Sequence, residues 1–236
     1  MFDKIKAYFQ GHKPLRFGTL LRWHALKGIL AGRIGPGEKL LDIGSYDGFS
    51  AGRIKEKLGN LAVVVIDTDK SGLQAARDRG LYALHASALN LPIADQSLDT
   101  VLCLDVIEHV AEDDRLVREI GRVLKSGGKL ILTTPAAPIV TFPLVKLARV
   151  EAINREWGHV RFGYTLEELG RLFATAGLTI AWKGRYFNVF SRLAYYLAAL
   201  SKVRVRGSSF FFRCVIRLEP IVKWGSQEHI LVGVKG

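Results

Sequence analysis

The sequence predicts an α/β fold: a doubly wound, seven-stranded, mostly parallel sheet with helical insertions. Short apolar segments alternate with helix-like segments from residue 38 onward, as expected of βαβ units. One of these segments, Leu61–Ile66, is apolar throughout, which is typical of a strand covered on both faces. At 236 residues the chain is long enough for one such domain. We therefore expect a single domain, with an N-terminal helical extension over 1–37 and insertions over 135–163 and 186–227 that cap a substrate.

The individual elements follow from local patterns. Apolar runs between turn residues predict strands over Lys39–Ile43, Leu61–Ile66, Leu81–Ala86, Thr100–Leu104, Lys129–Thr133, Leu178–Lys183 and His229–Val234. Helical spacing predicts helices over Gly48–Leu58, Ser71–Gly80, Glu112–Leu124 and Thr165–Gly177, and over much of residues 1–35. Ser71 is the predicted N-cap of its helix, and Thr165 with Glu168 form a predicted capping box.

The formal net charge of +12 is compatible with nucleic acid, an anionic membrane surface or an acidic small substrate as partner. The N-terminus lacks the apolar segment of a signal peptide, and no run reaches the roughly 18–20 apolar residues of a membrane-spanning helix. We expect a cytoplasmic protein that is soluble or peripheral at the inner face of a membrane. Cys103 and Cys214 are expected to be reduced, and because no Cys/His cluster has metal-ligand spacing, no metal site is predicted.

The turn after the first strand predicts the kind of cofactor. A dinucleotide fingerprint requires glycines at positions 44, 46 and 49, but the chain has Gly44, Tyr46 and Phe49. Tyr46 argues against a pyrophosphate, since a glycine there lets the backbone approach that group. The carboxylate of S-adenosylmethionine needs only a few backbone N–H groups and the positive end of the helix starting near Gly48. Asp67, after the second strand, can accept both ribose hydroxyls of either cofactor, or it can be a solvated loop residue.

Six further patterns follow one another over residues 38–134: Leu40-Leu41-Asp42-Ile43-Gly44, Val65-Ile66-Asp67, Leu89-Asn90-Leu91-Pro92, Leu98-Asp99-Thr100-Val101, Val106-Ile107-Glu108-His109-Val110 and the run Arg118–Gly128. In this order and spacing they resemble the motifs of the class I S-adenosylmethionine-dependent methyltransferases. The similarity is nearest to the branch that includes ubiquinone-type and small-molecule methyltransferases, and it resumes weakly over 159–183. The resemblance implies a Rossmann-like methyltransferase fold, S-adenosyl-L-methionine as cofactor, and methyl transfer.

The resemblance also implies which residues bind the cofactor. It assigns Asp42, Gly44, Ser45 and Gly48 to the methionine portion, Asp67 and Thr68 to the ribose, and Ser87, Ala88 and Leu89 to the adenine, with Tyr46 and Leu104 completing the set. Two residues depart from the family pattern. Tyr46 replaces the usual middle glycine, and Ser87 stands where an aspartate commonly accepts the adenine amino group. We expect weaker discrimination of adenine, because a hydroxyl lacks the charge-assisted strength of a carboxylate.

Position along the chain indicates the acceptor side of the site. Orientation supplies much of the rate of an in-line methyl transfer, so a base is needed only for an unactivated hydroxyl or amine. His109 is the candidate catalytic residue, with a structural histidine at a helix start as the alternative. Its neighbours Asp105 and Glu108 can equally serve only to organise the turn. The candidate substrate-binding residues lie in the first insertion, where packing would explain them as well: His159, Arg161 and Tyr164.

The second insertion contains an amphipathic segment over 186–202. Its apolar face is predicted to hold Tyr186, Val189, Phe190, Leu193, Leu197 and Leu200, and its polar face Asn188, Ser191, Arg192, Tyr195 and Lys202. The apolar face can pack on the domain, cover a hydrophobic substrate, or lie in the plane of a membrane. The basic runs Val203–Arg206 and Arg213–Arg217, and the apolar run Phe210–Phe212 in a predicted loop, favour the last two.

These observations favour a methyltransferase that acts on a small-molecule or lipid-like substrate, in association with an anionic membrane surface. Nucleic acid is less favoured, because the basic residues are interleaved with apolar ones and no known nucleic-acid-binding module is present. Two alternatives stay open. One is an RNA or protein methyltransferase, and the other is an inactive cofactor-binding partner subunit, which the departures at Tyr46 and Ser87 would suit.

Overall fold

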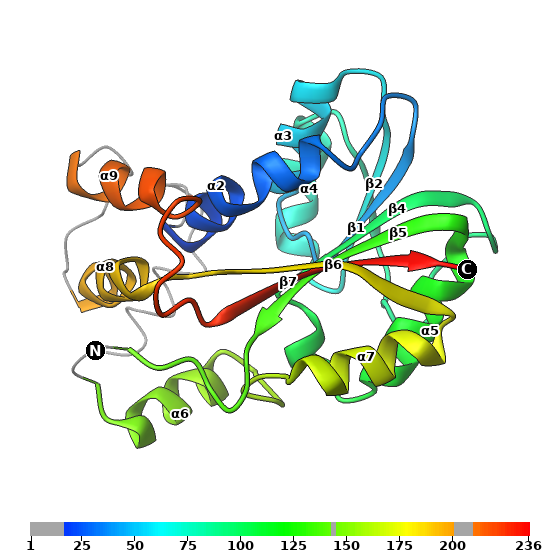
Figure 1. The fold of residues 1–236 in the computed structure, drawn as a ribbon. Coiled ribbons are helices and arrows are strands. Elements are labelled where there is room, and N and C mark those ends of the chain that lie inside the picture. The colour runs from blue at the N-terminus through cyan, green and yellow to red at the C-terminus, as the bar shows by residue number, and fades with distance from the viewer. Residues whose placement is uncertain (1–16, 143–144, 201–209) are drawn as a thin grey trace.

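A computed structural model describes residues 17–142, 145–200 and 210–236 and confirms the predicted fold class (Figure 1). Seven strands form one sheet in the order β3-β2-β1-β4-β5-β7-β6. The strands are β1 (Lys39–Ile43), β2 (Ala62–Asp67), β3 (Tyr82–His85), β4 (Leu98–Leu104), β5 (Leu124–Pro135), β6 (Leu178–Tyr186) and β7 (Glu228–Lys235). The pairs from β3 to β5 are parallel, and β7 runs antiparallel to both β5 and β6. The sheet is therefore mostly parallel, as expected.

The helices lie close to their predicted positions. They are α2 (Phe17–Ala31), α3 (Phe49–Leu58), α4 (Lys70–Asp78), the 3-10 helix η1 (Ile107–His109), α5 (Asp113–Val123), α6 (Leu147–Glu156), α7 (Leu166–Thr175), α8 (Val189–Leu200) and α9 (Phe210–Leu218). The capping box of Thr165 and Glu168 is present. The predicted N-cap of α4 was wrong by two residues: Asp69 is the cap, and its side chain accepts a hydrogen bond from the backbone of Ser71.

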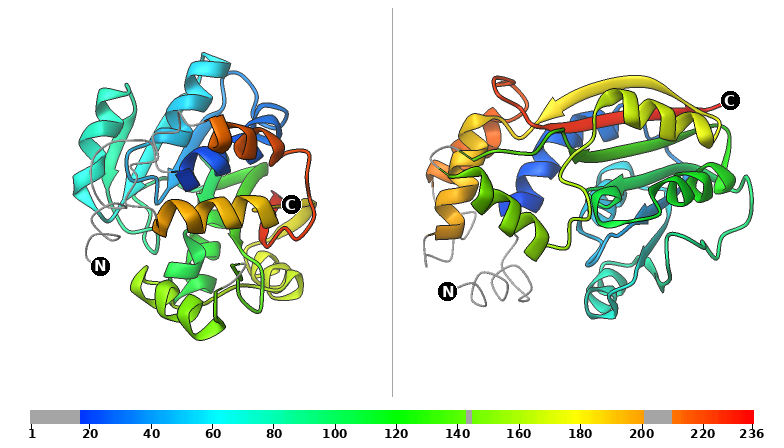
Figure 2. Two further views of the ribbon diagram at one scale, coloured as in Figure 1. Left: turned by 90° about the vertical axis from the view of Figure 1, so that its left-hand side faces the viewer. Right: turned by 90° about the horizontal axis from the view of Figure 1, so that it is seen from below.

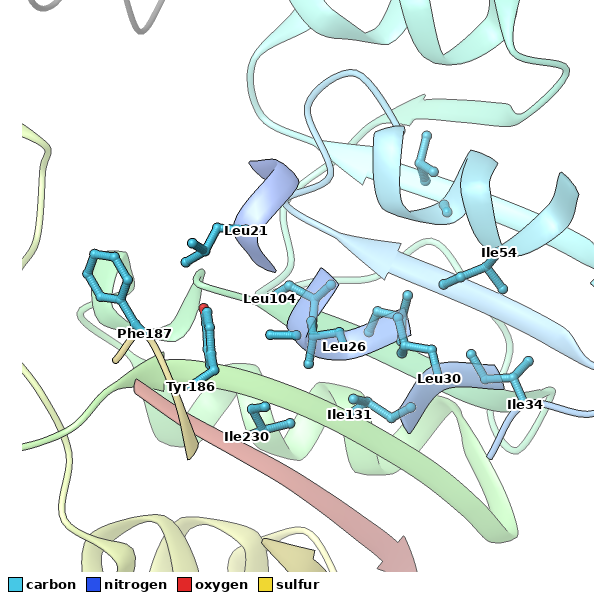
Figure 3. Close-up of a cluster of buried hydrophobic side chains, with 14 of the residues drawn as sticks. Leu21, Leu26, Leu30, Ile34, Ile54, Leu104, Ile131, Tyr186, Phe187 and Ile230 are labelled. Atoms are coloured by element: carbon cyan, nitrogen blue, oxygen red, sulfur yellow. The ribbon is translucent and has the colours of Figure 1, made fainter. Parts of the chain in front are cut away.

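Two apolar cores lie on opposite faces of the sheet, and alternate residues of each strand enter different cores. In β1, Leu40 packs in the core under α2, α3 and α4, whereas Leu41 packs in the core under α5 and α7. Figure 3 shows the first core, in which Leu26 and Leu30 of α2 lie over Ile131 and Ile230 of the sheet. Each buried leucine or isoleucine contributes on the order of 2 kcal/mol to folding.

The helices of the two insertions, α6, α8 and α9, gather with the start of α2 at one end of the molecule (Figure 2). The run Phe210–Phe212, predicted in a loop, instead begins α9. Within the described ranges, no helix has the length and apolar character needed to span a bilayer. Several predicted features lie outside the described residues: the part of the N-terminal helix over 1–16, Lys202 and the basic run Val203–Arg206.

The predicted orientation of α8 was wrong. Ser191 and Arg192, together with Asn188 just before the helix, are buried, while Phe190 is 49% exposed. Tyr186 ends β6 and is not part of the helix. The cause lies in distant residues, because the buried carboxylate of Glu219 accepts hydrogen bonds from the Ser191 hydroxyl and from the backbone N–H groups of Phe187 and Asn188.

Arg192 is held in a similar way. Its guanidinium donates to the carbonyl of Thr141, to the Gln227 side chain at 2.8 Å and to the carbonyl of Gly225 at 3.1 Å. Buried polar groups are tolerated when they are hydrogen-bonded, so tertiary partners reverse the face that the helical wheel predicts.

Candidate functional site

The turn between β1 and α3 brings the backbone close to the carboxyl ends of the strands. Gly44 has φ +63°, and its N–H donates to the carbonyl of Ile66 at 2.9 Å. A Cβ at this position would lie 2.6 Å from Cγ2 of Val106. Both the conformation and the space therefore require glycine at position 44.

Tyr46 adopts φ +49° and packs on α4. Its ring lies so close to Gly72 that a Cβ there would be 2.7 Å from Cδ2 of the tyrosine. Gly48 serves packing too, since a Cβ on it would meet Leu81 at 2.6 Å and Ala76 at 3.0 Å. Tyr46 is therefore accommodated by a glycine on the neighbouring helix, and its side chain is not among those that line the cavities described below.

A first cavity of about 520 Å³ lies at the carboxyl ends of β1, β2 and β4. Six of the predicted cofactor residues line it: Gly44, Asp67, Thr68, Ser87, Ala88 and Leu89. The hydroxyl of Ser87 accepts the N–H of Leu89 at 3.2 Å. The other predicted cofactor residues are not among its lining: Asp42, Ser45, Tyr46, Gly48 and Leu104.

Asp67 and Asp42 support the turn in different ways. The Oδ2 of Asp67 accepts the N–H of Tyr46 at 2.7 Å and its Oδ1 accepts the N–H of Asp69 at 2.8 Å, so backbone groups fix its carboxylate at the cavity wall. Asp42 is buried behind the turn, where it accepts the hydroxyl of Ser45 at 2.7 Å. Burial raises the pKa of Asp42 to about 6, although the Ser45 hydroxyl and the charge of Arg22 oppose the shift.

A second cavity, of about 410 Å³, adjoins the first and shares Asp105 and His109 with it. Its walls are rich in aromatic side chains from both insertions and the end of β6: Phe142, Trp157, Phe162, Tyr186, Phe187 and Tyr195. Three of these contact one another, with ring centroids of Phe142 and Phe187 6.0 and 5.6 Å from Tyr195. The cavity is thus an aromatic chamber that meets the first cavity at two polar residues.

Charged groups form the floor of this chamber. Nη1 of Arg22 lies 2.6 Å from Oδ2 of Asp105. The same oxygen accepts the hydroxyl of Tyr186, and Oδ1 accepts the hydroxyl of Thr133. Burial and the charge of Asp105 raise the pKa of the Glu108 carboxyl well above its usual range, and they act in the same direction on Glu228. One buried oxygen of Glu228, Oε2, has no hydrogen-bond partner. Sequence reasoning missed Arg22 and Glu228, because nothing near them in the chain indicates that α2 and β7 meet here.

His109 and His159 both line the chamber and contact each other edge to face, with ring centroids 4.6 Å apart. Burial lowers the pKa of His109, and burial together with the charge of His109 lowers the pKa of His159 to about 4. Both imidazoles are therefore neutral at pH 7, and Nδ1 of His159 is buried without a partner. Potential ligand atoms of these histidines and of Glu108 lie within 4.8 Å of one another, an arrangement able to hold a metal ion. Sequence spacing could not reveal this group, because His159 comes from the first insertion.

The other two candidate substrate residues lie elsewhere. The hydroxyl of Tyr164 donates to Asp113 at 3.0 Å, and Nε of Arg161 lies 2.9 Å from the same carboxylate. Neither is among the residues that line the two cavities. These contacts join the first insertion to the start of α5. They correspond to the packing role that the sequence offers as the alternative to substrate binding.

Part of the chain is similar in sequence to known methyltransferases. A family model described as "Methyltransferase domain" matches residues 41–132. The ubiquinone/menaquinone biosynthesis C-methyltransferase UbiE of Xanthomonas oryzae pv. oryzae is 28% identical over 159 residues, which cover 62% of this chain and 57% of the relative. The UbiE protein of Vibrio cholerae is 29% identical over 156 residues, covering 62% and 60%. The chain thus spans less than two thirds of the length of these relatives.

Solved structures show the same fold. A putative sarcosine dimethylglycine methyltransferase from Galdieria sulphuraria has a TM-score of 0.66 at 18% identity, covering 92% of this chain and 85% of that one. Geranyl diphosphate C-methyltransferase from Streptomyces coelicolor A3(2), in complex with Mg²⁺, geranyl diphosphate and S-adenosyl-L-homocysteine, has a TM-score of 0.65 at 15% identity, covering 91% and 77%. At these identities the similarity concerns the architecture.

Proposed function

Because the chain belongs to the class I S-adenosylmethionine-dependent methyltransferases, we propose that it transfers a methyl group to a small or lipid-like acceptor bound in the aromatic chamber. One observation carries the proposal: the cavity at the strand ends and the aromatic chamber meet at Asp105 and His109. A methyl group presented from the first cavity would reach an acceptor in the second at this junction. Holding both molecules in line is the largest contribution such an enzyme can make.

The first cavity fits the cofactor. Asp67 keeps free lone pairs for two ribose hydroxyls, and its orientation is fixed by backbone groups. Leu89 and Val106 offer apolar surface to the adenine, and Ser87 retains a hydroxyl proton that can be donated to a ring nitrogen. Gly44 lets the backbone approach the methionine portion. When bound, S-adenosylmethionine supplies a methyl group on a positively charged sulfur. Asp42 and Ser45 act from behind the turn by holding its shape.

His109 is proposed as the base that takes the proton of a hydroxyl or amine acceptor. It lines both cavities, and the lowered pKa keeps its imidazole unprotonated near neutral pH. His159 contacts its ring and is proposed to bind the acceptor and help orient His109. Asp105, held by Arg22, Thr133 and Tyr186, presents a fixed negative charge beside the junction.

The two insertions are proposed to be parts of one domain that together cover the acceptor. Trp157 from 135–163 and Tyr195 from 186–227 contact each other with ring centroids 6.0 Å apart, so neither insertion closes the chamber alone. Apolar aromatic walls above a polar floor suit a lipid-like molecule with one polar, proton-bearing group. Such an acceptor would be met at a membrane surface, where we propose that the protein associates peripherally.

Two measurements test this function. Isothermal titration calorimetry should detect binding of S-adenosylmethionine to the wild-type protein and a loss of at least tenfold in affinity for Asp67→Ala; no binding by the wild type would overturn the cofactor site. Incubation with methyl-labelled cofactor and a lysate should place label in the organic-extractable fraction. Label confined to precipitated protein or RNA would overturn the small or lipid-like acceptor.

A further inference from the structure

Helix α8 turns polar side chains toward the protein and an aromatic side chain toward solvent. Ser191 and Arg192 are buried, and their hydrogen bonds to Glu219 and to the carbonyl of Thr141 fix this orientation. Phe190 therefore cannot turn inward without leaving those polar groups unpaired, which would cost about 1–3 kcal/mol for each group. The exposure of Phe190 is built into the packing of the helix.

Phe190 contacts Trp224, and we use the name apolar patch for these two residues together with Leu218, at the end of α9, and Ile221, in the turn that follows it. The ring centroids of Phe190 and Trp224 are 6.4 Å apart, and the N–H of Ile221 donates to the carbonyl of Leu218 at 3.0 Å. Ile221 and Trp224 are 76% and 72% exposed. Half of the eight large apolar side chains exposed in the described part of the chain lie in this patch, so it is a concentration and not a scatter of single residues.

Basic residues lie next to the patch in the chain. Residues 186–227 contain seven Lys or Arg, of which Arg192 is buried, and a single acidic residue, Glu219, which is completely buried. Arg217 and Lys223 are exposed and flank Leu218 and Trp224 in the chain. An exposed apolar surface with a tryptophan and a basic border is complementary to the surface of an anionic lipid bilayer, where the rings enter the headgroup region and the cations pair with phosphates.

We propose that the apolar patch docks the protein onto an anionic lipid bilayer. The position of α8 connects the docking surface to the proposed acceptor site. Tyr195 within α8, and Phe187 just before it, line the aromatic chamber, so the helix that carries Phe190 to the bilayer also forms part of the chamber wall. The docking end of the molecule is the end where α2, α6, α8 and α9 gather, as the left view of Figure 2 shows. Docking on a bilayer rests on the proposed function for its purpose, but the residues of the apolar patch are not among those that line the two cavities.

Co-sedimentation of the full-length protein with vesicles tests it. Wild-type protein should sediment with phosphatidylcholine vesicles that contain about 30% phosphatidylglycerol, and much less with phosphatidylcholine alone. The double variant Ile221→Ser/Trp224→Ser should lose at least tenfold in partition coefficient. Arg217→Gln and Lys223→Gln should each lose about fivefold, and 0.5 M salt should weaken wild-type binding further.

Tyr82→Ser is the matched control. Tyr82 is 73% exposed but lies on β3, at the far edge of the sheet, so its loss should leave the partition coefficient unchanged. Circular dichroism and calorimetry with S-adenosylmethionine should be the same for all variants, which separates a failure of docking from a failure of the cofactor site. Wild-type-like sedimentation of the double variant would overturn the proposal. So would a dimer in light scattering, without lipid, that the double variant abolishes, since the patch would then bind a second copy.

Discussion

Arg22 and Asp105 form an ion pair, with Nη1 and Oδ2 2.6 Å apart, that joins α2 to the carboxyl end of β4. The same guanidinium donates to the carbonyl of Leu104 at 2.9 Å. Burial acts against the charge on Arg22, but the neighbouring carboxylates raise its pKa above the ordinary value. Asp105 itself is held at φ +55°, a strained conformation for a residue with a side chain. Arg22 thus supplies the positive charge that allows Asp105, Glu108 and Glu228 to sit together.

Arg22→Met should lower the free energy of unfolding by about 2 kcal/mol, because it leaves the partly buried carboxylate of Asp105 without its cation. Urea denaturation at pH 7 measures this loss. Arg118→Ala is the control, since Arg118 lies 2.7 Å from Asp114 in a pair that is half exposed. Its loss should cost less than about 0.5 kcal/mol. Equal losses for the two variants would show that the pair at the cavity floor has no special role.

Gly72→Ala should distort the cofactor turn, because the added Cβ would lie 2.7 Å from the backbone and ring of Tyr46. We expect a net loss of about 1–2 kcal/mol in stability, as in other overpacked sites, and weaker binding of S-adenosylmethionine in calorimetry. Gly170→Ala is the matched control. Gly170 lies within α7, and an added Cβ there would have no neighbour within 4 Å, so alanine should stabilise the protein by about 0.5–1 kcal/mol. A Gly72→Ala variant with unchanged cofactor affinity would contradict the packing role of Tyr46.

His109→Gln should lower kcat by about 10²–10⁴-fold if His109 is the base, with the dissociation constant for S-adenosylmethionine changed by less than about threefold. The wild-type kcat should fall toward acid pH below 6.5, since burial lowers the pKa of His109 and protonation removes the base. The variant should lose this acid limb. An unchanged pH–rate profile in His109→Gln would assign the base to another group.

Asp42→Asn should alter how stability depends on pH. Burial raises the pKa of Asp42 to about 6, so the folded protein binds this proton more tightly than the unfolded chain, whose aspartates titrate near 4. Protonation of Asp42 therefore stabilises the folded state fully below pH 4. This stabilisation, about 3 kcal/mol, is lost as the pH rises through 6. The asparagine variant keeps a neutral side chain. It should therefore exceed the wild type in melting temperature at pH 7, and the difference should vanish at pH 4.

The sequence predicts the central strands well because their neighbours are nearby in the chain. β1 has the predicted bounds, since Leu40, Leu41 and Ile43 form a short apolar run that ends at the turn residue Gly44. β5 is longer than predicted because its ends are set by partners, Leu98 at one end and Glu228 at the other. The first cavity likewise contains six of the predicted residues, all close to a strand end.

The features that the sequence could not predict depend on distant contacts. The helical wheel for α8 places Ser191 on the solvent face. In the structure Ser191 is buried, because its hydroxyl donates a hydrogen bond to Glu219, 28 residues away in the chain. The floor of the chamber joins Arg22 from α2 with Glu228 from β7. Arg161 and Tyr164 are predicted to contact substrate because they lie in the first insertion, and the structure places both against Asp113 of α5.

The placement of β7 between β5 and β6 has a consequence for folding during synthesis. β6 bonds to the sheet through β7 alone in the strand order, and roughly forty residues separate the end of β6 from the start of β7. At about 5–20 residues per second, a nascent β6 therefore waits some 2–8 s for its partner, with α7 already made and the exposed edge of β5 beside it. The five strands from β3 to β5 can pair during that interval. A ribosome-bound chain that ends before residue 228 should hence show protected amides in β1 and β4 and rapid hydrogen exchange in β6.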